Sequence, residues 1–183
     1  GKISDIDFKS DIVQFLTSQF VALKNTTLVE HLMLNHFYKL PKEKQNADFI
    51  KQVEESMSIV IGKTAPDFSW TEDGKQMSLS SLKDGQSYLL IFYSTSCSHC
   101  EREVPQVFEF MKGKNNTKVI AFAMETDDTG WQTFKKKLPG WHHVLGLNKW
   151  ENETARKYQI TSTPTYFVLG MDKRFIANPE TLK

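Results

Sequence analysis

The sequence predicts an α/β fold, with a central β-sheet flanked by helices, that follows a small helical segment. Two observations support this prediction. Up to about residue 60, apolar residues recur at helical spacing with polar residues between them. From residue 61 onward, short β-type runs alternate with helical periods, which is the pattern of βαβ units. We therefore expect a helical region over residues 1–60 and an α/β domain over residues 61–183.

Three short amphipathic helices are expected in the helical region. Asn25, Thr26 and Thr27 offer a cap, and Pro41 interrupts the pattern. The apolar stripes that define the helices are Phe8, Ile12, Phe15, Leu16 and Leu23, then Leu28, Leu32 and Phe37, and then Phe49, Ile50, Val53, Met57 and Val60. Because an apolar stripe must be covered, we expect each one to pack on another element.

The α/β domain is expected to contain six strands and three helices. The strands are predicted at residues 67–71, 87–93, 118–124, 142–145, 165–169 and 174–177, and the helices at 97–112, 129–138 and 151–158. The runs 89–92 and 119–122 are apolar without alternation. Such runs are typical of central strands that are buried on both faces of a sheet.

The charge balance argues against several classes of protein. Lys and Arg number 23 against 22 Asp and Glu, so a net charge of +1 provides no basic field for nucleic acid and no polybasic patch for anionic lipid. No apolar run approaches the roughly 18 residues that a membrane-spanning helix needs. The start of the sequence has no signal-peptide pattern, and a removed signal would leave the same start.

The chemical centre is the pair Cys97 and Cys100, the two cysteines of the chain. The pair follows a predicted buried strand and opens a predicted helix. A helix N-terminus carries unpaired N–H groups and a partial positive charge, so it stabilises a thiolate and lowers its pKa below roughly 8.5. Cys97 is then the nucleophile in disulfide exchange, and Cys100, about one turn away, is the resolving thiol.

Two other readings of the pair remain open at this point. A purely structural disulfide would close a very short loop, which stabilises a fold least in the chain-entropy model. A zinc site built from Cys97, His99 and Cys100 would need further ligands, and His142 and His143 would have to lie close by chance. Redox chemistry is favoured over both, and we expect no metal.

The residues around this pair resemble the thioredoxin superfamily, with the TlpA/ResA-like extracytoplasmic oxidoreductases as the most similar branch. The resemblance rests on residues 88–100 with Glu103 and Pro105, on the 61–68 segment, which is also similar to the opening of peroxiredoxins of the AhpC/TSA type, on Gly74 with residues 77–82, and on residues 163–169. It covers about residues 61–178. It implies a thioredoxin fold with a central mixed β-sheet, and the helical region lies outside it.

The resemblance also implies roles for further residues. Pro164 would follow a cis peptide bond and lie against the cysteine pair, and the backbone of Thr163 would hydrogen-bond an extended substrate segment. Glu103 would exchange a proton with Cys100, or raise its pKa by like-charge repulsion. The alternative for Glu103 is an ordinary first-turn acid that favours the helix dipole.

His99 is the main departure from a reductase pattern. A histidine beside the thiolate stabilises the reduced form and makes the disulfide more oxidising, as in DsbA. The alternative is a solvent-exposed histidine without a redox role. Ser96 stands where the family often has Trp, and Ile91 stands where thioredoxin itself has a buried Asp.

Four functions follow from these patterns. The preferred one is a thiol–disulfide oxidoreductase that reduces protein disulfides in the periplasm or cell envelope, with a signal or anchor removed. Its cofactor is the Cys97–Cys100 disulfide alone, and its partners are protein substrates and an upstream thiol donor, which could be membrane-embedded. The alternatives are an oxidase or isomerase, a thiol peroxidase, and a non-enzymatic interaction module. The peroxidase is disfavoured because Ser94 and Leu90 replace the Thr and Pro of its motif.

Overall fold

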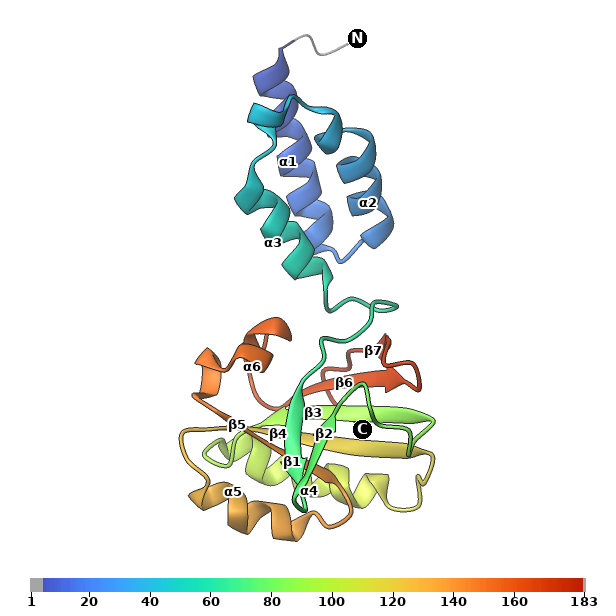
Figure 1. Cartoon of the computed structure of the whole chain (residues 1–183), viewed down its shortest axis with the longest axis vertical. Coiled ribbons are helices and arrows are strands. Elements are labelled where there is room, and N and C mark those ends of the chain that lie inside the picture. The colour runs from blue at the N-terminus through green and yellow to red at the C-terminus, as the bar shows by residue number, and fades with distance from the viewer. Residues whose placement is uncertain (1–4, 183) are drawn as a thin grey trace. The chain divides into compact units, whose positions relative to one another are not determined.

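The computed structural model describes residues 5–182, and the chain divides into two compact units between Val60 and Ile61 (Figure 1). The first unit holds α1 (Ile6–Ala22), α2 (Thr26–Asn35) and α3 (Ala47–Met57), with short 3₁₀ turns η1 (Phe37–Lys39) and η2 (Lys42–Lys44) between the last two. Asp5, Asn25 and Asn46 cap the three helices, because each side chain accepts backbone N–H bonds that the first turn leaves unpaired.

The apolar stripe of α1 faces away from the core of the helical unit, which contradicts the predicted packing. Phe8, Phe15 and Leu23 are 55%, 62% and 72% exposed, whereas Ser10, Val13 and Thr17 are buried. Thr17 can be buried because its hydroxyl donates to the carbonyl of Val13, at 2.7 Å. Periodicity therefore located the apolar face of α1 correctly but not the side on which the helix packs.

The stripe of α3 packs as predicted. Phe49, Val53, Met57 and Val60 are buried, and they join residues from the other elements in one core. In α2 the expected Leu28 is exposed, and Val29 and Met33 are buried in its place. The core of the unit consists of Val13, Val29, Met33, Phe37, Leu40, Phe49, Val53, Met57 and Val60.

The second unit is built on a five-stranded sheet, which is mixed, as the resemblance implied. The strand order is β5-β4-β3-β6-β7, with β3, β4 and β5 parallel and β6 and β7 antiparallel to their neighbours. The strands are β3 (Ser87–Tyr93), β4 (Thr117–Glu125), β5 (His142–Leu147), β6 (Thr165–Gly170) and β7 (Phe175–Ala177). Five of the six predicted strands correspond to them with small differences at the ends.

A hairpin precedes the sheet, and half of it was not predicted. β1 (Ser69–Glu72) corresponds to the sixth predicted strand, and β2 (Lys75–Ser78) pairs with it antiparallel. Asp73 and Gly74 form the turn, and both have positive φ, as a two-residue hairpin turn with the right twist requires. β2 is half exposed and lacks the apolar alternation that marks a strand in the sequence.

Helices cover both faces of the sheet (Figure 1). Leu89, Ile91 and Tyr93 face α4 (Ser98–Met111) and α5 (Thr129–Phe134), and the latter continues into the turn η3 (Lys135–Lys137). On the other face, Phe92 stacks on Phe122 and on Tyr158, which follows the short helix α6 (Glu153–Lys157). The central strand is thus buried on both sides, as its unbroken apolar run indicated.

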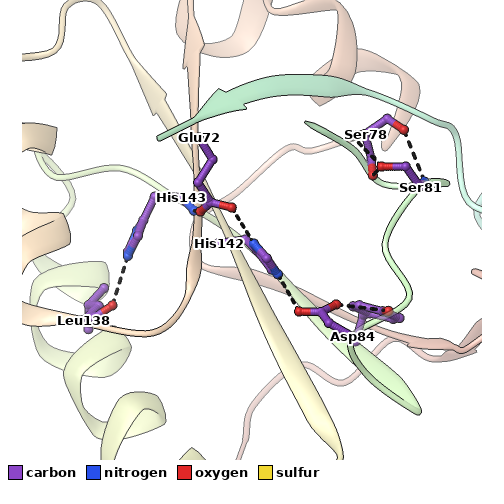
Figure 2. Close-up of polar contacts among 8 residues, drawn as sticks. Glu72, Ser78, Ser81, Asp84, Leu138, His142 and His143 are labelled. Carbon is purple, nitrogen blue, oxygen red and sulfur yellow. Dashed lines mark hydrogen bonds and ion pairs between the residues drawn. The ribbon is translucent and has the colours of Figure 1, made fainter. Parts of the chain in front are cut away.

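His142 ties the hairpin to the sheet (Figure 2). Its Nδ1 lies 2.7 Å from Glu72 Oε2 at the end of β1, and its Nε2 lies 2.9 Å from Asp84 Oδ2 in the loop before β3. Burial alone would lower the pKa of His142, but hydrogen bonds and the charges of both carboxylates outweigh it and raise the pKa. His143 Nε2 donates to the carbonyl of Leu138, at 2.9 Å. Both histidines therefore serve the packing of the sheet edge.

Candidate active site

The two cysteines lie where the chain passes from the end of β3 into α4. Cys97 is the N-cap of α4, and its N–H donates to the carbonyl of Ser94, at 3.2 Å. Cys100 lies in the first turn of the helix and is fully buried, whereas Cys97 is partly exposed. Both are free thiols in this structure. The spacing of three residues thus places one thiol at the surface and the other directly beneath it in the core.

The surroundings shift the pKa values of the two thiols in opposite directions. Burial opposes ionisation of Cys97, but hydrogen bonds from the backbone amides of Cys100 and His99 and from the side chains of Thr163 and Cys100 outweigh it and lower its pKa. Burial, reinforced by the neighbouring Cys97, raises the pKa of Cys100 to about 12. Near neutral pH, Cys97 is therefore the better nucleophile and Cys100 holds its proton.

The loop before β6 closes the site from the other side. The peptide bond between Thr163 and Pro164 is cis, as the resemblance implied. The Cys97 thiol donates to the Thr163 carbonyl, at 3.4 Å. This loop lies 66 residues from Cys97 in the chain, and the antiparallel pairing of β6 with β3 brings the two together. A substrate segment that runs beside Thr163 would therefore pass within reach of the Cys97 sulfur.

Glu103 lies one helical turn beyond Cys100 and is partly buried. Its Oε2 accepts a hydrogen bond from Tyr166 Oη, at 3.5 Å. Burial, together with the charges of Glu103 and Cys100, raises the pKa of Tyr166 well above its ordinary value. Tyr166 is therefore hydrogen-bonded to Glu103 and also lies close enough to Cys100 to feel its charge, which places Glu103 in the neighbourhood of the resolving thiol.

His99 is exposed, and its ring points to Arg102. Arg102 Nη2 lies 3.0 Å from His99 Nδ1. A guanidinium can only donate, so the imidazole nitrogen accepts in this pair. The ring thus engages a cation one turn along the helix, and it is the backbone N–H of His99 that supports the Cys97 thiolate.

A buried carboxylate that the sequence analysis missed supports the loop before Cys97. Glu125 is 5% exposed at the end of β4, and its Oε1 accepts the Thr95 N–H at 2.5 Å. A chain of hydrogen bonds runs from Lys149 through Ser96 and Ser94 to Glu125 Oε2, with distances of 3.2, 3.0 and 3.5 Å. Because β3 and β4 are parallel, their carboxyl ends meet, and this signal could have placed Glu125 beside the site.

A small cleft of about 130 Å³ opens over the nucleophile. It is lined by Ser94, Ser96, Cys97, Met124, Lys149, Trp150 and Thr163. Lys149 and Trp150 come from the turn η4 (Lys149–Glu151) after β5, and the sequence analysis gave Lys149 no role at the site. Three loops, each following the end of a strand or preceding β6, thus form the rim around Cys97.

The comparisons with known proteins agree with this geometry. A model of the AhpC/TSA family matches residues 61–177. The thiol-disulfide oxidoreductase ResA of Bacillus thuringiensis subsp. konkukian is 31% identical over 130 residues, which cover 67% of this chain and 70% of that protein. The chain belongs to the AhpC/TSA family, on its TlpA/ResA-like branch.

Solved structures place this family member in the thioredoxin superfamily. A domain of a possible thiol-disulfide isomerase from Cytophaga hutchinsonii superposes with a TM-score of 0.56 at 27% identity, over 65% of this chain and 83% of that one. A thioredoxin-like protein from Bacteroides caccae superposes with a TM-score of 0.59 at 15% identity, over 97% of this chain and 74% of that one. The chain is therefore a thiol–disulfide oxidoreductase, as the names of its relatives state for them.

Within residues 5–182, no group of three or more His, Cys, Asp or Glu side chains is placed so that it could hold a metal ion. His142 and His143, which the zinc reading needed, are bonded to Glu72, Asp84 and Leu138 instead. None of the helices described is long and apolar enough to cross a membrane.

Proposed function

We propose that this enzyme is a reductase of protein disulfides in the cell envelope. The observation that carries the proposal is the contrast between the two thiols: Cys97 is accessible and its pKa is lowered, whereas Cys100 is buried and its pKa is raised. A reductase needs an exposed thiolate that attacks first and a protected thiol that acts second.

The proposed cycle transfers two electrons to the substrate. The Cys97 thiolate attacks one sulfur of the substrate disulfide, which forms a mixed disulfide and releases the other sulfur as a thiolate that takes up a proton. Cys100 then loses its proton and attacks the Cys97 sulfur. The mixed disulfide breaks, the second substrate thiol leaves, and the Cys97–Cys100 disulfide remains. The pair itself carries the electrons, so the cycle needs no other cofactor.

Two neighbouring groups would assist the second half of this cycle. Glu103 is proposed to take up the proton of Cys100, with Tyr166 between them as a hydrogen-bonding partner of the carboxylate. Thr163 and Pro164 are proposed to hold the extended substrate segment beside Cys97. The oxidised pair would then be reduced by an upstream thiol donor, and we place that donor in the membrane, with the enzyme in the periplasm.

The geometry of His99 favours the reducing direction. The His99 ring is bonded to Arg102 rather than to Cys97, which weakens the reason to expect a strongly oxidising disulfide. The second candidate is an oxidase or isomerase. It is favoured by the presence of His99 between the cysteines and by the related structure from Cytophaga hutchinsonii, which is described as a possible isomerase.

The experiment that tests the proposal is reduction of a protein disulfide by single-cysteine variants. The fully reduced enzyme should reduce the interchain disulfides of insulin at a rate that depends on its concentration. Cys100→Ser should accumulate a mixed disulfide with the substrate, because nothing resolves it, and Cys97→Ser should form none. Trapping through Cys100 in the Cys97→Ser variant, or no trapping by either variant, would overturn the proposal.

A further inference from the structure

Lys149 stands at the rim of the cleft over Cys97. Its ammonium donates to the hydroxyl of Ser96, at 3.2 Å, and Ser96 directly precedes the nucleophile. Among the described residues that line this cleft, Lys149 supplies the single positively charged side chain. Its hydrogen-bond partner is an uncharged hydroxyl, and the ion pairs found among residues 5–182 do not include it, although its charge acts on the exposed Asp127.

The backbone around Lys149 has an unusual conformation. Asn148 and Lys149 have φ values of +70° and +45°, so two successive residues other than glycine lie in the left-handed region. Strain of this kind persists where the surrounding structure requires it, and it concentrates at functional sites. Here the conformation turns the chain at the end of β5 so that Lys149 and Trp150 both line the cleft.

Lys149 is not a major support of the Cys97 thiolate. The main contributions that lower the pKa of Cys97 come from the backbone amides of Cys100 and His99 and from the side chains of Thr163 and Cys100. Lys149 does lower the pKa of Asp127, but that carboxylate is fully exposed and already accepts the Thr129 N–H, at 2.9 Å. The ammonium of Lys149 therefore lines the cleft in which a substrate would lie, and its hydrogen-bond partner there is the uncharged hydroxyl of Ser96.

We infer that Lys149 is a specificity residue that selects protein disulfides whose attacked cysteine is next to an acidic residue. This inference rests on the proposed function, because it needs a substrate segment beside Thr163. Such a segment would place the residue adjacent to its cysteine in the cleft, within reach of the ammonium. A carboxylate there gains a charge-assisted hydrogen bond, and a lysine in its place meets a like charge. The side chain of Trp150, which is 48% exposed, provides an apolar wall beside the proposed contact between the Lys149 ammonium and the substrate carboxylate.

The test uses a set of peptides that differ at one position. Each peptide contains one cysteine, held in a mixed disulfide with 2-mercaptoethanol, and carries Glu, Gln or Lys next to it. The rate constant for reduction by the reduced enzyme is measured for each peptide, and ratios are compared within each variant, so that general effects on Cys97 cancel. We expect the wild type to prefer Glu over Lys by on the order of fivefold, and this preference should shrink at high salt.

Variants at position 149 are expected to change the ratio of the rate constants for the Glu and Lys peptides in different ways. Lys149→Gln should bring the Glu-to-Lys ratio close to one, Lys149→Glu should reverse it, and Lys149→Arg should retain it. The matched control is Lys114→Gln, which removes an exposed lysine beyond the far end of α4 and should keep the wild-type ratio.

Several outcomes would overturn the inference. These are equal rates for the three peptides in the wild type, a preference that survives in Lys149→Gln, or a Lys149→Gln variant that slows all peptides alike while shifting the pH midpoint of Cys97 alkylation. In each of these cases the peptides are still reduced, so the proposed function stands. A wild-type enzyme that reduces no peptide at all would instead overturn both.

Discussion

At the residue scale, Cys97 and Cys100 share one helical turn and differ in what surrounds them. Cys97 caps the helix and receives N–H groups that the first turn leaves free, while Cys100 is enclosed by the core between β3 and α4. The same short spacing thus produces a reactive thiolate and a protected thiol.

This difference predicts the pH dependence of alkylation. Iodoacetamide reacts with thiolates, so on the reduced protein it should modify Cys97 with a midpoint below the ordinary value of roughly 8.5. Cys100, with a pKa of about 12, should stay unmodified up to about pH 9 in the native protein. Mass spectrometry of the alkylated peptides checks both statements. A midpoint at or above the ordinary value, or earlier modification of Cys100, would contradict them.

Glu125 is the second residue whose surroundings lead to a prediction. Glu125→Ala leaves the Thr95 N–H without its partner in a partly buried setting, so it should lower the free energy of unfolding by about 1–2 kcal/mol. Glu125→Gln keeps an oxygen acceptor and should cost less. Urea unfolding measures both, with the exposed Glu109→Ala as control. Equal losses for Glu125→Ala and Glu109→Ala would show that Glu125 does not support the loop.

A local motif in the sequence predicted the cysteine pair, and the family resemblance implied the cis bond before Pro164. The sequence did not predict Glu125 and Lys149, whose partners Thr95 and Ser96 lie 30 and 53 residues away. Such contacts arise from the order of the strands in the sheet. Local motifs do not predict them, because the prediction needs the parallel register of β3, β4 and β5.

At the scale of elements, the β1–β2 hairpin depends on a charge at the sheet edge. The pKa of His142 is raised and that of Asp84 is lowered, so both groups are charged in the folded protein between about pH 4 and pH 6.5. The raised pKa of His142 means that its stabilising effect is complete below its unfolded value of about 6.5 and is lost as the pH rises through its folded value. The effect of Asp84 is lost as the pH falls through its folded value.

A pH-dependent loss of stability follows for this element. His142→Gln should lower the free energy of unfolding by about 0.5–1 kcal/mol near pH 5.5, a modest value because Asp84 is 42% exposed, and by less at pH 9. Urea unfolding at both pH values measures the difference. In a double-mutant cycle, Asp84→Asn should remove part of the effect of His142→Gln. A loss of unfolding free energy that is larger at pH 9 than near pH 5.5 would contradict the ion pair between His142 and Asp84. Effects of the two substitutions that are strictly additive would contradict it as well.

The helices show where periodicity stops being informative. The stripe of α3 predicted its buried residues, since the unit core covers it. The stripe of α1 was equally regular, yet within the described unit it remains exposed and Ser10 and Thr17 are buried in its place. A pattern identifies an apolar face, and only the packing of the neighbours decides which face is covered.

At the scale of the whole molecule, the sheet brings four separate segments to one point. The ends of β3, β4 and β5 and the loop before β6 supply the nucleophile, the buried carboxylate, the lysine and the cis-proline loop. The unbroken apolar runs predicted the central strands, and the family resemblance implied that the sheet is mixed. The sequence did not predict β2, whose residues are half exposed and match no strand pattern.

The redox potential of the Cys97–Cys100 pair tests the central claim most directly. The purified protein is equilibrated in glutathione and dithiothreitol buffers, and the fraction of reduced thiol is followed by alkylation. The account predicts one reversible two-electron step with a midpoint near or below about −250 mV, on the thioredoxin side of the scale. A midpoint above about −180 mV would contradict the reductase and favour an oxidase or isomerase, and no reversible step would contradict the redox function itself.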